Sequence, residues 1–227
     1  MGESIRATYP TDQFGRDTLS RIIMGARVSL VVAVFSVAVA LALGTTVGLL
    51  SGYLGRWVDG LAMRLMDILF AFPAILLAIA IMAVAGTSMR NLILAIGIVY
   101  TPQFARVARA ATLTVKHLEF IEAAQALGAG TGRVLGRHLL PNIMAAIIVQ
   151  VSLSLSLAIL SESALSFLGL GTQPPTPSWG NMLSEGRQFM ESAPWNAVFP
   201  GAALNLVVLG FNLLGDGLRD LLDPRLR

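Results

Sequence analysis

Five long apolar runs divide the chain, and short polar stretches separate them. Each run is close to the roughly twenty residues that a helix needs to cross the hydrocarbon core of a bilayer. Pattern and length together predict an all-α, polytopic membrane protein with five transmembrane helices. The predicted spans are residues 28–50, 68–89, 91–111, 139–161 and 197–215.

Composition supports the membrane class. Of the 227 residues, 55% are hydrophobic and only 13% are charged, which is outside the usual range for soluble globular proteins. The absence of cysteine excludes disulfides and thiolate metal sites. The two histidines are too few to indicate a metal site, so we assign no catalytic residue, metal or cofactor. The net charge of +3 is modest and does not indicate nucleic-acid binding.

Prolines and glycines refine the spans. Pro73 stands near the start of the second run and should kink that helix or begin it. Gly44, Gly48 and Gly52 recur every four residues, a spacing that permits close helix approach. We expect these glycines to pack against a neighbouring helix of the same subunit.

A polar island separates the third and fourth spans. Residues 119–127 are good helix formers, and Gly128 can end that helix in a left-handed conformation. Thr131 can cap a second short helix, and Pro141 should break the chain before the next apolar run. A helix, a turn and a second helix suit docking into a groove on a partner protein, although an ordinary cytoplasmic loop fits the same pattern.

Two acidic residues stand at the edges of spans. Asp67 is either a boundary charge, capped or paired with Arg64, or part of a gate near the cytoplasmic mouth. Glu162 follows the fourth run, where an ionisable group is a candidate functional site, and with Asp67 it is a candidate pore or gate residue. Alternatively, Glu162 lies at the interface or pairs with a polar group of a neighbouring subunit.

Basic residues indicate the orientation. Ten of the sixteen Lys and Arg residues fall on the side that holds the island and the chain end, and six fall on the other. The positive-inside rule therefore places the island and the carboxyl terminus in the cytoplasm. This orientation leaves the four arginines before the first span outside, which is the one feature that is inconsistent with the positive-inside rule.

The island also carries a recognisable motif. Glu122-Ala123-Ala124, then Gly128, then Leu140-Pro141 resembles the signature loop of membrane subunits of binding-protein-dependent ATP-binding-cassette importers. The segment 137–142, Arg-His-Leu-Leu-Pro-Asn, is similar to the dipeptide, oligopeptide and nickel branch. The resemblance implies that this loop is a coupling helix seated in a cleft of the ATPase subunit.

The likeness covers nearly the whole chain and is of the dipeptide permease C-type. It includes segments 11–21, 25–27, 66–73, 165–171, 174–183, 212–220 and 222–227. Such permeases usually have six spans, with one before the segment that starts this chain. We expect either that the first helix is absent or that the chain starts downstream of its natural start. The domains expected are an outer segment, 1–27, a membrane domain, 28–215, with coupling loop 112–141 and outer loop 169–195, and a cytoplasmic tail, 216–227.

The resemblance implies a non-catalytic permease subunit in the bacterial inner membrane. Its expected partners are a second permease subunit, two ATP-binding subunits and an extracytoplasmic solute-binding protein. The sequence contains no Gly-x-x-x-x-Gly-Lys-Ser/Thr loop, so ATP must bind elsewhere. The expected cargo is a di- or oligopeptide, with nickel or another small solute as the alternative. A secondary transporter is less favoured because the spans lack charge, and an intramembrane enzyme because they lack a histidine base.

Overall fold

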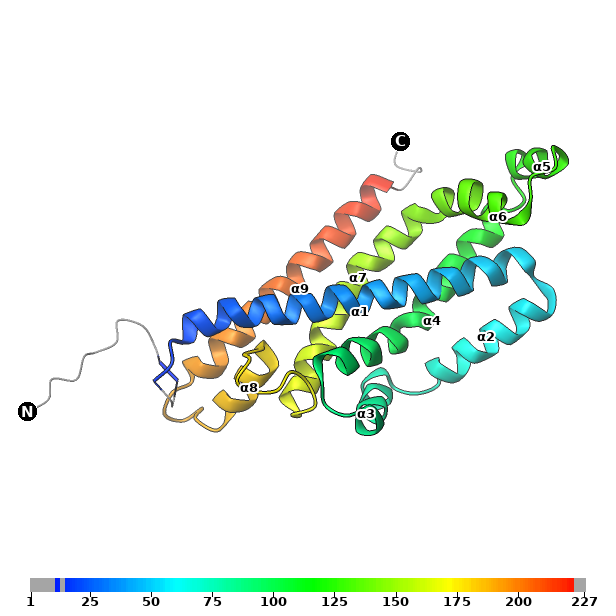
Figure 1. The fold of residues 1–227 in the computed structure, drawn as a ribbon. Coiled ribbons are helices and arrows are strands. Elements are labelled where there is room, and N and C mark those ends of the chain that lie inside the picture. Colours follow the sequence, from blue (N-terminus) through cyan, green and yellow to red (C-terminus); the bar gives the residue numbers. More distant parts are fainter. Residues whose placement is uncertain (1–10, 13–14, 223–227) are drawn as a thin grey trace, which may run out of the picture.

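The computed structural model describes residues 11–12 and 15–222, and within them the chain is almost entirely helical (Figure 1). The remaining residues of the predicted amino-terminal segment and tail, 1–10, 13–14 and 223–227, lie outside the described residues. The elements in order are α1 (Thr18–Leu54), α2 (Arg56–Phe70), α3 (Ala74–Ala85), α4 (Met89–Val115), α5 (Glu119–Ala126), α6 (Thr131–Arg133), η1 (Val134–Leu139), α7 (Leu140–Phe167), α8 (Trp179–Arg187) and α9 (Trp195–Leu222).

Four of the described helices are long and apolar enough to cross a membrane, namely α1, α4, the continuous helix ending with α7, and α9. A fifth span is possible if α2 and α3 together count as one crossing. The all-α membrane fold predicted from the apolar runs is therefore confirmed. The helices α5 and α8 lie far apart, at opposite ends of the bundle (Figure 1).

Helix α1 begins earlier and runs further than the sequence suggested. Asp17 is its N-cap, and its carboxylate accepts hydrogen bonds from the backbone N–H groups of Leu19 and Ser20. Hydrogen bonds from Ser20 hold the pKa of the Asp17 carboxyl below its usual range. Residues 18–27, which precede the predicted first span, are instead the first turns of one 37-residue helix, because nothing in the sequence after Asp17 breaks it.

The glycine repeat brings α1 and α4 together. A Cβ on Gly44 would lie 2.5 Å from the carbonyl oxygen of Thr101, and one on Gly48 would overlap the Ala105 carbonyl oxygen. From the other side, a Cβ on Gly97 would lie 2.7 Å from a methyl group of Val39. The glycines thus serve packing within the chain, as expected, and allow the two backbones to touch.

The second predicted span is broken. Helix α2 ends at Phe70, Pro73 is the N-cap of α3, and the two helices meet at 90°. Pro73 does begin a helix, as expected, but α3 has only 12 residues, so residues 68–89 do not form one straight crossing. Proline at the junction explains the break, since it disfavours a helical conformation in the residue before it.

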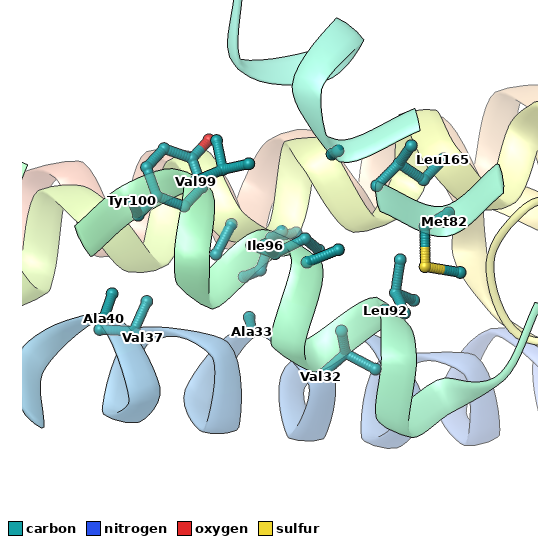
Figure 2. Close-up of a cluster of buried hydrophobic side chains, with 14 of the residues drawn as sticks. Val32, Ala33, Val37, Ala40, Met82, Leu92, Ile96, Val99, Tyr100 and Leu165 are labelled. Atoms are coloured by element: carbon teal, nitrogen blue, oxygen red, sulfur yellow. The ribbon is translucent and has the colours of Figure 1, made fainter. Parts of the chain in front are cut away.

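The apolar core lies where α1, α3, α4 and α7 meet. Figure 2 shows Val32 and Val37 of α1 facing Ile96 of α4, with Met82 of α3 and Leu165 of α7 on the other side. All five side chains are almost completely buried. This cluster fixes the relative positions of the spans and therefore of the loops that join them.

Pro141 does not break the chain, contrary to the expectation. Residues 131–167 form one continuous helix, in which a π-helical segment, η1, precedes α7. Pro141 stands in the first turn of α7. Its missing N–H is tolerated there, where the π-helical segment already changes the hydrogen-bonding register.

The ends of the bundle are also defined by polar contacts. At the end that holds α8, Arg21 Nη1 lies 2.7 Å from Asp12 Oδ2 and 2.9 Å from Glu185 Oε2. Trp179 of α8 is buried and donates from Nε1 to the Ile22 carbonyl oxygen at 3.1 Å. Helix α9 extends seven residues past the predicted end of the fifth span, to Leu222.

Candidate functional site

The polar island folds into α5, α6 and η1 between α4 and α7, and we call this segment the elbow. Helix α5 has only 8 residues and ends in the turn that the sequence predicted at Gly128. Gly128 has φ of +82°, the Ala129 N–H donates to the Ala124 carbonyl, and the Gly128 N–H donates to the Gln125 carbonyl. This pair of bonds is a Schellman motif, which explains why glycine is needed at this position.

One side of the elbow is anchored. Ile121 of α5, Val134 and Leu139 are completely buried. They belong to a cluster that also contains Leu49 of α1 and Ile147 of α7. The elbow is therefore packed on three membrane helices and cannot swing independently of them.

Two polar contacts add to this anchor. Lys116 Nζ donates to the Gly52 carbonyl oxygen at 2.9 Å, and Gln125 Nε2 donates to the Tyr53 hydroxyl at 3.3 Å. Both acceptors belong to the last turn of α1. The carboxyl end of α1 is thereby tied to the start and the middle of the elbow.

The other side of the elbow is open. Glu122, Ala123 and Gly128 are exposed, and Ala124 is half-exposed. Leu127 is 89% exposed although it is a large apolar side chain. These residues form the exposed side of the elbow, which is the part of the motif predicted to meet a partner protein.

Leu140 and Pro141 lie away from this exposed side. Leu140 is half-buried and lines a groove of about 520 Å³ between α1 and the start of α7, together with Leu41 and Leu135. Pro141 is exposed at the helix start. The structure therefore separates the Glu122–Gly128 part of the motif, which faces outward, from the Leu140-Pro141 part, which shapes the helix that follows.

The two candidate gate residues have different surroundings. Asp67 is exposed and its Oδ1 lies 2.7 Å from Arg106 Nη2, so its partner comes from α4 and not from the neighbouring Arg64. Glu162 is completely buried within the bundle. It accepts a hydrogen bond of 2.7 Å from Ser166 Oγ and a longer one, 3.4 Å, from Ser163 Oγ, both in its own chain.

Sequence reasoning missed further polar contacts between the spans. Arg109 of α4 contacts both carboxylate oxygens of Asp59 in α2, at 2.5 and 2.6 Å. Gln150 of α7 donates to Gln103 of α4. The two glutamines could have been noticed in the sequence, because amide side chains inside apolar runs are unusual. Only the fold shows that they meet. Within the described part of the chain, no three His, Asp or Glu side chains gather in a way that could hold a metal.

Comparison with known families and relatives gives a consistent result. Residues 44–227 match the model of the binding-protein-dependent transport system inner membrane component. The dipeptide transport system permease protein DppC of Alkalihalophilus pseudofirmus is 53% identical over all of this chain and 75% of its own length. The glutathione transport system permease protein GsiD of Pectobacterium atrosepticum is 51% identical over 95% of this chain and 72% of its own.

Solved structures agree in fold. An inward-facing form of the MetNI methionine ABC transporter superposes with a TM-score of 0.71, at 16% identity, over 91% of this chain and 98% of the other. An amino acid ABC transporter crystallised with histidines gives a TM-score of 0.64 at 13% identity, over 88% and 94% of the two chains. At these identities the likeness concerns the helical arrangement alone.

Proposed function

Because this chain belongs to the family of binding-protein-dependent transport system inner membrane components, we propose that it carries small peptides across the membrane and that α5 couples it to an ATPase. The chain is the membrane-spanning permease of an ABC importer, and it is a multi-pass membrane protein. A permease of this kind works with a separate ATPase and a solute-binding protein. We infer that the chain itself catalyses no reaction.

The proposed cargo is a di- or oligopeptide. It is supported by two relatives that are more than half identical to this chain, which are named for dipeptide and for glutathione transport. Nickel or another small solute remains the alternative cargo. Uptake of a radiolabelled dipeptide into proteoliposomes that contain the assembled transporter, its binding protein and internal ATP tests the proposal, and ATP-dependent uptake of nickel without peptide uptake would favour the alternative.

We also propose the assembly and its orientation. This permease pairs with a second, different permease subunit, and two ATP-binding subunits attach at the cytoplasmic face. The amino-terminal segment is outside, while α5 and the end of α9 are in the cytoplasm. The distribution of basic residues supports this orientation, since most of them lie on the side of α5 and of the chain end.

Coupling rests on one observation: α5 is fixed to the membrane helices on one side and open on the other. Ile121 is completely buried, whereas Leu127 is 89% exposed on the same short segment. A cleft on the ATPase that receives Leu127, Ala123 and Glu122 would bury the apolar side chain. When the ATPases close, the displacement of α5 tilts α4 and α7, because Ile121 of α5 packs in one apolar cluster with residues of both helices.

Substitution of Leu127 tests this coupling. Leu127→Asp should weaken co-purification of the ATPase and abolish ATP-dependent uptake, while the permease still inserts in the membrane. The control is Leu118→Asp, because Leu118 is half-exposed and lies just before α5. An exposed residue elsewhere, such as Val84, is not suitable because it lies in α3. Equal ATPase binding by wild type and Leu127→Asp would contradict the proposed docking surface.

A further inference from the structure

A recess lies between α4 and the right-angled bend that joins α2 to α3. Its volume is about 250 Å³. Phe70, Phe72 and Pro73 of the bend form one wall, and Val99 and Gln103 of α4 form the other. The recess is apolar except for the Gln103 amide, so that amide determines what the recess can recognise.

Gln103 is held by a second amide. Gln150 Nε2 of α7 donates to Gln103 Oε1 at 3.3 Å and to Ser154 Oγ at 3.1 Å. None of the hydrogen bonds found among the described residues uses Gln103 Nε2, and this nitrogen is not one of their buried side-chain atoms without a partner, so it is accessible where Gln103 lines the recess. Both glutamines are half-buried and stand well inside their helices, α4 and α7. An amide donor at membrane depth without an acceptor is costly in lipid, so another molecule is expected to supply one.

This side of the bundle does not suit contact with lipid. The chain between α2 and α3 is not helical, and irregular backbone at membrane depth occurs only where protein or a polar cavity covers it. One turn beyond Gln103, Arg106 lies 4.3 Å above the ring of Phe70 and pairs with Asp67 at 2.7 Å. Both partners of that ion pair are exposed. The Gln103 amide and the Asp67–Arg106 ion pair thus add polar groups beside the apolar recess, as expected of a translocation path.

We propose that Gln103, positioned by Gln150, contacts main-chain amide groups of the transported peptide and that the apolar recess receives one of its side chains. A primary amide offers a donor and an acceptor, which match the C=O and N–H of a peptide bond. Because the amide is neutral, the contact is weak enough for the peptide to leave, as passage through a pore requires. The inference rests on the proposed peptide cargo. A helix of the second permease subunit seated in the recess is the competing occupant.

A single cysteine tests which molecule reaches Gln103. The chain contains no cysteine, so Gln103→Cys provides a unique thiol. The probe is a dipeptide that carries a haloacetyl group on one side chain, whose halide the thiolate displaces. In the complete transporter with binding protein and ATP, Gln103→Cys should be labelled. Asn205→Cys is the matched control, because the Asn205 amide in α9 donates to its own helix at the Gly201 carbonyl, 2.8 Å away. Absence of labelling at Gln103→Cys by the dipeptide, with cross-linking of the same thiol to the second permease by a bifunctional reagent that alkylates the thiol and captures a neighbouring side chain, would overturn the proposal.

Uptake kinetics provide a second measurement. With saturating loaded binding protein, Gln103→Leu should slow dipeptide uptake about three- to tenfold, the effect of one lost hydrogen bond. The ATPase rate stimulated by binding protein should stay within about twofold, because Gln103 is not part of the α5 surface that is proposed to contact the ATPase. Asn205→Leu should leave uptake unchanged. Normal uptake by Gln103→Leu overturns this inference alone, whereas wild-type vesicles that import no peptide overturn the proposed function as well.

Discussion

Gly128 shows how one residue controls the shape of the candidate coupling site. Its φ of +82° is strained for any residue with a Cβ, although a Cβ there would meet nothing within 4 Å. The cost of substitution is therefore conformational and not steric, about 1–2 kcal/mol for a left-handed residue. Because Gly128 is exposed, this cost should distort the elbow locally and leave the membrane bundle intact.

Substitution by valine should therefore separate coupling from folding. We expect Gly128→Val to abolish ATP-dependent uptake while membrane insertion and expression stay at wild-type levels. Gly128→Asn should retain much of the activity, since asparagine tolerates the left-handed conformation better than other residues. Gly60→Val is a matched control, because Gly60 is helical and a Cβ there also meets nothing within 4 Å. Normal uptake by Gly128→Val would contradict the role assigned to this turn.

At the scale of an element, the contact of α1 with α4 depends on residues without side chains. A Cβ at Gly48 would overlap the backbone of α4, which cannot move aside as a flexible side chain could. Gly48→Val should therefore push the two helices apart and lower the thermal unfolding temperature of the detergent-solubilised protein. Overpacking of this kind costs about 1–3 kcal/mol. An unfolding temperature equal to that of Gly60→Val would show that the two helices pack less closely than described.

The position of α2 depends on an ion pair with α4. Arg109 contacts both carboxylate oxygens of Asp59, and both side chains are partly shielded from solvent. We expect a double-mutant cycle with Asp59→Asn and Arg109→Met to give a coupling free energy of about 1 kcal/mol, since partial exposure limits the attraction. Chemical denaturation in detergent measures it. Strictly additive single substitutions would mean that this ion pair does not help to hold α2 in place.

At the scale of the whole molecule, the orientation in the membrane can be tested directly. Single cysteines at Leu127, next to α5, and at Gln173, in the loop before α8, should react from opposite sides of the membrane. In intact cells a membrane-impermeant thiol reagent should label Gln173→Cys, whereas Leu127→Cys should react only after the membrane is opened. The reverse pattern would place α5 outside and would remove the basis for coupling to a cytoplasmic ATPase.

The sequence alone determined the membrane class, the approximate spans, the elbow and its glycine turn. Long apolar runs, glycine at a helix end and proline at a helix start act locally, through solvation and backbone conformation, and so can be recognised without the fold. Such local signals were insufficient where neighbouring structure offset the effect of the residue. Pro141 was read as a break, yet the π-helical segment before it lets the helix continue.

Only the tertiary structure decided which distant residues meet. Asp67 pairs with Arg106, and Gln103 meets Gln150, and neither pairing follows from spacing along the chain. The 90° angle between α2 and α3 likewise depends on how α3 packs on α4. Contacts between helices depend on their crossing positions and rotations, which are set by the packing of the whole bundle.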